Sequence, residues 1–177
     1  MEEYATDLKN TTVVEFDGEI FLSSCDTNKK LESLYKYNLQ SKRQVLLFSS
    51  PNKSDVITDM AVCSDYIAAI DRDNKAIKLY IRRSQAVSTV KVPGLNELYR
   101  LSFSYDGKFL LVSGLDLTEI DRLNKYRLST TGVLSLVWSC DECPEVRSMR
   151  FDDHGLLYVN GKENRRIFTL THKGLEF

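Results

Sequence analysis

The sequence "LYRLSFSYDGKFLLVSG" (residues 98–114) has a near copy in "VRSMRFDDHGLLYVNG" (residues 146–161). Each stretch alternates apolar and polar residues, reaches a polar turn that contains aspartate and glycine, and continues as a second apolar run. Alternation with a period of two is typical of half-buried strands, and glycine supplies the positive φ that a tight hairpin turn requires. Each stretch therefore predicts a β-hairpin.

Two weaker copies of this hairpin occur earlier in the chain. They are "TTVVEFDGEIFLSS" (residues 11–24) and "VITDMAVCSDYIAAID" (residues 56–71). A fixed period of this kind is the sequence signature of a repeat architecture. The four turn positions are spaced by 47, 42 and 48 residues, at Gly18, Asp65, Gly107 and Gly155.

A second marker follows each hairpin, namely an asparagine and then a basic residue, at Asn28, Asn74, Asn124 and Asn164. A third apolar run comes after the marker, and in three units a fourth run comes after that. Four short strands in each period, with no helical periodicity between them, describe the blade of a β-propeller. A β-sandwich is the alternative, but it does not explain why both markers recur.

The sequence thus predicts one all-β domain over residues 1–177, of the β-propeller repeat type. It is built from about four four-stranded antiparallel blades, and the propeller is incomplete. The blades are expected at approximately residues 11–50, 56–94, 98–140 and 146–177.

Two segments resemble the core of the NHL repeat, namely "YIAAIDRDNKAIKLY" (residues 66–80) and "GLLYVNGKENRRIFTL" (residues 155–170). The resemblance covers most of residues 11–177. It implies a non-catalytic interaction domain, like the C-terminal propeller of tripartite-motif proteins. Those propellers usually have more blades than the four expected here, so a fragment of a longer propeller is favoured over an unusually small one. An open arc would leave sheet faces and edges uncovered, which favours self-association.

Composition limits the classes of function. The 177 residues include 24 basic and 25 acidic side chains and carry a net charge of −1, so nothing global attracts nucleic acid or anionic lipid. The polar start of the chain lacks the pattern of a secretory signal, and no apolar run is long enough to span a membrane. The expectation is a cytoplasmic protein that does not bind membranes.

The residues that carry chemistry are sparse. Cys140 and Cys143 form a Cys-x-x-Cys pair without a second pair of ligands nearby, which favours a structural role over metal or redox chemistry. Nucleophile-elbow and phosphate-loop motifs are absent from the sequence. We therefore expect no catalytic residue, no metal and no cofactor. A metal-dependent propeller hydrolase remains an alternative, although its candidate carboxylates do not occupy equivalent repeat positions: Glu15, Asp59, Glu97 and Glu145.

The loops from second to third strands should share one face with the loops that join successive blades. Loops carry function more often than core residues do, so this face is the candidate surface for a protein partner. RNA is the alternative ligand, through the basic members of the set. The bland interpretation is a solvated face whose Asn and Asp residues form turns. The candidates are Lys29, Lys30, Asp71, Arg72, Asp73, Lys75, Arg165 and Arg166.

The opposite face should carry the turns from third to fourth strands, "QSKRQ" (residues 40–44) and "RRSQA" (residues 82–86). Two neighbouring blades would bring their basic residues together. Such a cluster is either a patch for an anion or partner, or a set of charges that keeps the protein soluble. Its members are Lys42, Arg43, Arg82 and Arg83.

Overall fold

A computed structural model describes residues 8–26, 31–49, 57–141, 145–152, 154, 156–162, 165–171 and 174–176. For residues 8–11, 25–26, 31–32, 165–171 and 174–176 it describes the backbone alone. All regular secondary structure in these ranges is β-strand. The chain is therefore all-β, as predicted, and within the described residues no helix has the length and apolar character needed to cross a membrane.

Within the described residues, sixteen strands form four separate sheets. The first sheet contains β1 (Leu8–Phe16), β2 (Glu19–Asp26), β3 (Leu31–Asn38) and β4 (Arg43–Ser49). The second contains β5 (Ile57–Val62), β6 (Tyr66–Asp71), β7 (Ala76–Ile81) and β8 (Ala86–Val90).

The third sheet contains β9 (Glu97–Phe103), β10 (Phe109–Leu115), β11 (Asp121–Leu128) and β12 (Leu134–Cys140). The fourth contains β13 (Ser148–Phe151), β14 (Leu156–Asn160), β15 (Arg165–Thr171) and β16 (Gly174–Glu176). In every sheet the strands stand in chain order and pair antiparallel with their neighbours. The prediction of about four four-stranded antiparallel blades is confirmed.

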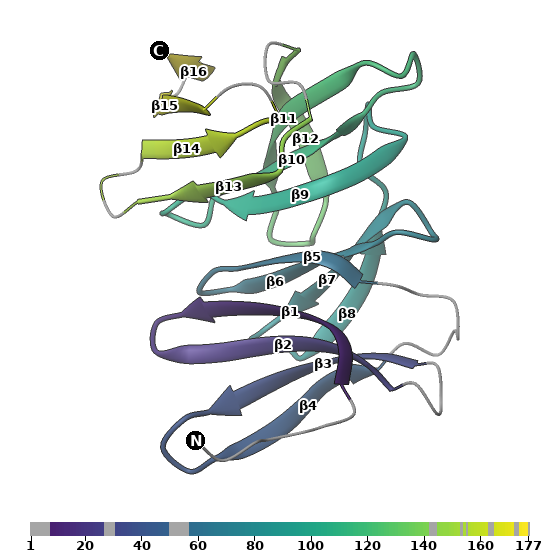
Figure 1. The fold of residues 1–177 in the computed structure, drawn as a ribbon, viewed down its shortest axis with the longest axis vertical. Helices are drawn as coiled ribbons and strands as arrows, with labels where there is room; N and C mark the ends of the chain where they lie inside the picture. Colours follow the sequence, from purple (N-terminus) through teal and green to yellow (C-terminus); the bar gives the residue numbers. More distant parts are fainter. Residues whose placement is uncertain are drawn as a thin grey trace.

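In Figure 1 the first sheet lies at the lower end, the second sheet lies above it, and the third and fourth sheets lie side by side at the upper end. The first strands of successive sheets, β1, β5, β9 and β13, lie next to one another. This is the arrangement of propeller blades around an axis, with one inner strand from each blade. The described chain forms an arc of four blades.

The cores lie between the sheets because the side chains of each strand alternate between two faces. In β6, Ile67 and Ala69 face the first sheet, whereas Ala68 and Ile70 face the third. Full burial of an isoleucine side chain such as Ile67 or Ile70 contributes about 1.5–3 kcal/mol relative to exposure. A third core, between the last two sheets, contains Leu111, Leu123, Val146, Leu157 and Val159.

The hairpin turns at Gly18 and Gly107 confirm the predicted glycine positions, since both have a positive φ, whereas Gly155 lies outside the described residues. Asp17 and Gly18 have φ of 52° and 71°, the two positive values that a two-residue type I′ turn requires. Gly114 has another reason to be glycine, because β9 passes very close to it. A Cβ atom at this position would lie 1.8 Å from the carbonyl oxygen of Glu97.

The third blade departs from the sequence prediction. The loop between β10 and β11 covers only residues 116–120, because β11 begins at Asp121. Asn124 and Lys125, interpreted as a turn marker, lie inside β11 and are 2% and 1% exposed. Leu123 and Tyr126 enter cores on opposite sides of the sheet, so apolar alternation sets the strand here and outweighs the turn preference of asparagine.

Candidate functional site

The turn between β6 and β7 is built on Asp71, the last residue of β6. Its carboxylate accepts hydrogen bonds from the backbone N–H (3.1 Å) and the side-chain amide (2.8 Å) of Asn74. Nζ of Lys78 lies 3.2 Å from the same carboxylate. Asp71 is 0% exposed, which corrects its assignment to an exposed binding face. It faces inward because its carboxylate stabilises the turn that leads into β7.

The other three candidates of this turn, Arg72, Asp73 and Lys75, are exposed as predicted. Nζ of Lys75 donates a hydrogen bond to Oδ1 of Asn96 (3.3 Å), in the connection between the second and third sheets. The backbone N–H of Asn96 donates to the carbonyl of Leu115 (2.7 Å) at the end of β10. Asn96 therefore joins the 72–75 turn to the end of β10 in the next blade.

The structure places the remaining candidates only in part. Lys29 and Lys30 lie outside the described residues. Arg165 and Arg166 were predicted in a loop, but they are the first two residues of β15, paired in register with Asn160 and Val159. Pairing with β14 extends β15 by two residues on its N-terminal side, so both arginines belong to the strand.

The 116–120 loop is held by Asp116, which sequence reasoning did not single out. Its carboxylate accepts hydrogen bonds from the Thr118 hydroxyl (2.6 Å) and the Ile120 N–H (3.1 Å), and from Nε of Arg122 (2.9 Å). These bonds hold the pKa of Asp116 well below its ordinary value, and the bond from the Thr118 hydroxyl has the largest effect. The fixed loop presents Leu117, which is 84% exposed.

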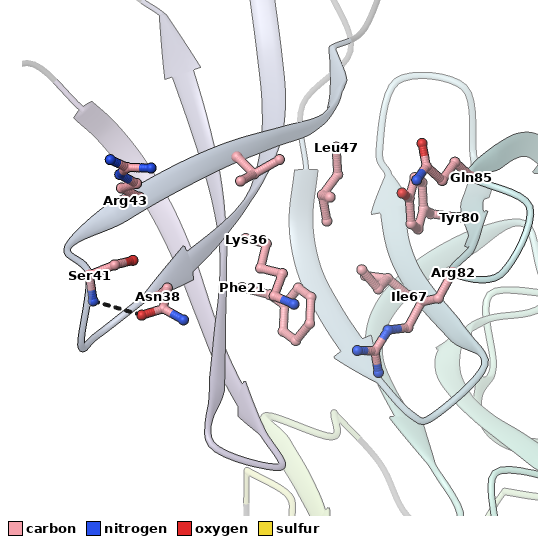
Figure 2. A pocket seen from close by; sticks show the side chains of 11 residues that line it. Phe21, Lys36, Asn38, Ser41, Arg43, Leu47, Ile67, Tyr80, Arg82 and Gln85 are labelled. Carbon is pink, nitrogen blue, oxygen red and sulfur yellow. Dashed lines mark hydrogen bonds between the residues drawn. The ribbon is translucent and has the colours of Figure 1, made fainter.

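A cleft opens between the first and second sheets, on the face of the β3–β4 and β7–β8 turns (Figure 2). Its volume is about 500 Å³. Side chains of the two sheets face each other across it. The apolar lining residues are Phe21, Val45, Leu47, Ile67 and Tyr80, and the polar ones are Lys36, Asn38, Ser41, Arg43, Arg82 and Gln85.

An ionic network ties the two walls of the cleft together. Nη2 of Arg82, in the second sheet, lies 2.6 Å from Oε2 of Glu19 in the first sheet, and Lys36 forms an ion pair with the other oxygen of Glu19. Nη1 of Arg82 donates to the carbonyl of Cys63 (3.1 Å). The guanidinium also lies 5.4 Å from the ring centroid of Phe21, within cation–π range. Arg82 therefore has a structural role as well as a place in the cleft.

Of the predicted basic cluster, Arg43 and Arg82 both line the cleft, but from its opposite walls (Figure 2). Lys42 and Arg83 belong to the two adjacent turns, but neither lines the cleft. The apolar floor was not predicted. Whether apolar residues line a cleft depends on how far the outer strands of two sheets lie apart. No local sequence pattern predicts that distance.

The carboxylates proposed for a hydrolase do not converge in the described residues. The carboxylate of Asp59 accepts a hydrogen bond from the backbone N–H of Leu101 (2.7 Å), and burial raises its pKa. Glu145 pairs with Lys162 (2.8 Å). Within the described part of the chain, no group of three or more His, Cys, Asp or Glu side chains is placed to hold a metal ion.

Two cysteines have described side chains, Cys63 and Cys140. Cys63 is buried in the core between the second and third sheets, and burial raises the pKa of its thiol. Such a thiol packs as a small hydrophobic group. Cys140 is half-buried at the end of β12, while Cys143 lies outside the described residues, so the geometry of the Cys-x-x-Cys pair is not described.

Solved structures share the fold of this chain. A Bacteroides fragilis protein, provisionally assigned as a 6-phosphogluconolactonase, superposes with a TM-score of 0.64 at 12% identity, over 96% of this chain and 52% of its own. A Lactobacillus plantarum protein gives 0.63 at 17%, over 88% and 52%. The periplasmic gluconolactonase PpgL of Pseudomonas aeruginosa gives 0.64 at 16%, over 93% and 51%.

This chain thus spans about half the length of the structures it matches. At 12–17% identity the similarity establishes the fold, and the four sheets correspond to about half of a β-propeller. No protein-family model matches the chain, and no curated protein matches it at a significant level.

Proposed function

We propose that this chain is a non-catalytic protein-interaction scaffold built from NHL-type repeats. The cleft between the first and second sheets is its binding site for an extended peptide segment, in which an acidic residue adjoins an apolar one. The observation that carries the proposal is the composition of the cleft, which combines an apolar floor with a basic rim.

The floor is rigid enough to hold an apolar side chain. Phe21, Ile67 and Tyr80 are buried members of the core between the first two sheets, so their positions are fixed by packing. Val45 lines the same cleft and is 57% exposed. Covering exposed apolar surface on binding is favourable in proportion to the area removed from water.

The rim selects for negative charge. Lys36, Arg43 and Arg82 line the cleft, and Glu19 is the carboxylate that pairs with two of them. Three cations against one anion leave a positive excess at the opening. Complementary charge speeds encounter and suppresses partners of the wrong sign. An acidic residue in the ligand therefore fits better than a neutral or a basic one.

The edge of the first sheet suits an extended ligand. β4 is the outer strand in the order β1-β2-β3-β4, and its residues Val45 and Leu47 line the cleft. Peptides commonly dock by adding a strand to such an edge, where main-chain hydrogen bonds give affinity and side-chain pockets give specificity. Among the strands of the described sheets, β4 pairs with β3 alone.

Titration of a labelled peptide library tests the proposal by fluorescence anisotropy. Its members are extended peptides with an acidic residue next to a large apolar one, and matched controls replace the acid by lysine or the apolar residue by serine. Binding should require both features, and either replacement should reduce affinity by roughly tenfold or more. Equal binding of the lysine-substituted peptides, or no binding to any member, would overturn the proposal.

RNA binding is a second candidate, favoured by one observation. Arg72 and Lys75 are both exposed on the same turn, where they could contact phosphates. Asp73, exposed between them, works against it. If RNA is the ligand, affinity for a single-stranded oligonucleotide should fall steeply with salt and be lost in Lys75→Glu. No binding at low salt removes this candidate.

Hydrolysis of a sugar lactone is a third candidate, because two of the matched structures carry gluconolactonase names. The proposed scaffold predicts no turnover of a gluconolactone, with or without added divalent ions. A rate above the uncatalysed one that scales with protein concentration would contradict the non-catalytic assignment.

A further inference from the structure

We propose that the cleft between the first and second sheets binds the 116–120 loop of a second copy of this chain. The inference rests on the proposed function of the cleft as a site for an acidic–apolar segment, and it names the partner that carries this segment. Each copy has one loop and one cleft, so the loop of one copy occupies the cleft of the next.

The 116–120 loop exposes a large apolar side chain to water. Leu117 is 84% exposed, more than any other large apolar side chain among the described residues. Ile120, at the end of the same loop, is 44% exposed. Covering both side chains on binding is favourable in proportion to the apolar area removed from water.

Hydrogen bonds within the loop fix its backbone before a partner arrives. The N–H of Asp116 donates to the carbonyl of Ile120 (3.0 Å), and the N–H of Glu119 donates to the carbonyl of Asp116 (3.2 Å). The carboxylate of Asp116 also accepts a hydrogen bond from the N–H of Thr118 (2.7 Å). A contact residue on a fixed loop loses little conformational entropy on binding, so more of the contact energy appears as affinity.

The loop also carries the acidic group that the cleft requires. Glu119 is exposed and directly precedes Ile120. The carboxylate of Asp116 is engaged inside the loop and by Arg122, so Glu119 is the carboxylate that the loop presents to a partner. The loop thus places an acidic residue next to an apolar one, which is the pattern proposed for the ligand of the cleft.

The cleft is complementary to both features of the loop. Its floor, which includes Ile67 and Tyr80, covers an apolar side chain such as Leu117. On its rim Arg82 is held by Glu19, whereas Arg43 stands exposed on the opposite wall (Figure 2). Arg43 is therefore the cation that meets the carboxylate of Glu119. Opposite charges on the two surfaces favour this pairing over contact between two clefts or two loops.

The loop and the cleft lie on opposite faces of the arc. The cleft opens on the face of the turns from third to fourth strands, whereas the 116–120 loop joins a second strand to a third. In an antiparallel sheet these two kinds of connection lie at opposite ends of the strands. A copy whose loop is bound therefore keeps its own cleft open for another copy, and the contact is head-to-tail.

Sedimentation velocity of the 177-residue chain, over a wide range of concentration, tests the inference. The wild type should form species larger than two copies as concentration rises. Leu117→Ser and Glu119→Lys in the loop, and Arg43→Glu in the cleft, should each weaken association by roughly tenfold or more.

Val133→Ser is the matched control. Val133 is 58% exposed in the turn between β11 and β12, so this change also removes an exposed apolar side chain but alters neither proposed surface. Association of Val133→Ser should equal that of the wild type. Circular dichroism checks that every variant is folded.

Mixing Leu117→Ser with Arg43→Glu gives the sharpest test. The first variant keeps an intact cleft, and the second keeps an intact loop. Each alone should remain monomeric where the wild type assembles. The mixture has one working loop and one working cleft, so it should form a pair that contains one copy of each variant and should not grow further.

The outcomes separate this inference from the proposed function. Leu117→Ser leaves the cleft unoccupied, so the acidic–apolar peptides should bind to it, and a failure to bind overturns the proposed function itself. A wild type that binds these peptides but stays monomeric at all concentrations overturns the inference alone. Weaker association in Val133→Ser, or a mixture that grows beyond two copies, shows general apolar association and also overturns the inference.

Discussion

Arg82 of the second sheet and Glu19 of the first sheet form an ion pair, with Nη2 of Arg82 2.6 Å from Oε2 of Glu19. The same guanidinium covers the ring of Phe21 and donates to the carbonyl of Cys63. The pair therefore fixes the separation of two neighbouring blades at the cleft that we propose as the binding site.

Replacing Glu19 by Gln should destabilise the chain only modestly. Both partners are about a quarter exposed, and pairs of this kind contribute about 0.5–1 kcal/mol. Urea denaturation at low salt should show this loss, and at high salt the difference from the wild type should shrink because solvent ions screen the pair. A loss that does not depend on salt would show that Glu19 stabilises the blades by packing and not by charge.

Replacing Asp71 by Asn should cost far more than replacing its neighbour Asp73. Removing one partner of a buried ion pair costs about 3–5 kcal/mol, and the exposure of Lys78 (14%) places the expected loss near the lower limit, about 3 kcal/mol. The matched variant Asp73→Asn changes an exposed carboxylate and should stay within about 0.5 kcal/mol. Equal urea midpoints for the two variants would contradict the structural role of Asp71.

Gly114→Ala should disrupt the third sheet. The added Cβ would overlap the carbonyl oxygen of Glu97, so β9 and β10 must separate at their bulge. Overpacking of this kind costs about 3 kcal/mol or more when backbone must move. Gly18→Ala is the control, because its Cβ meets nothing within 4 Å and only the positive φ is strained, at about 1–2 kcal/mol. A milder thermal shift for Gly114→Ala than for Gly18→Ala would contradict the close approach.

Asp116 should contribute to acid sensitivity. Its pKa in the folded chain lies below its value in the unfolded chain, so the folded state favours the ionised form. The contribution is present above the unfolded pKa of about 4 and is lost as pH falls toward the folded pKa. Asp116→Asn should therefore lower the free energy of unfolding at neutral pH and make it fall less steeply as the pH is lowered. An acid limb as steep as that of the wild type would contradict this role.

The arc of four blades could be predicted from the sequence because the turn and strand patterns are local and repeat along the chain. The glycine turns at Gly18 and Gly107, together with the alternating strands around them, predict hairpins of known period. The sequence does not predict whether a single polar side chain faces solvent or the interior. Asp71 stands at a strand end, where a carboxylate can face water or cap the next turn, and Asn124 looks like a turn residue although it lies inside a strand.

The cleft could be predicted only in part. Arg43 begins β4 and Arg82 follows β7, at the same end of neighbouring blades, so repeat alignment places both on one face. The apolar floor of Phe21 and Tyr80 cannot be read in this way, since both residues also satisfy the ordinary pattern of a buried strand. Whether they face a core or an opening depends on the angle between two sheets, which is set by packing along the whole arc.

The most direct test of the peptide-binding cleft compares two charge reversals in one titration of an acidic–apolar peptide. Arg43→Glu changes the rim of the cleft, and Arg72→Glu changes the turn on the opposite face. We predict that Arg43→Glu reduces affinity by roughly tenfold or more, whereas Arg72→Glu leaves it unchanged. Loss of binding in Arg72→Glu with full binding in Arg43→Glu would contradict the account and assign the partner to the face of the 72–75 turn.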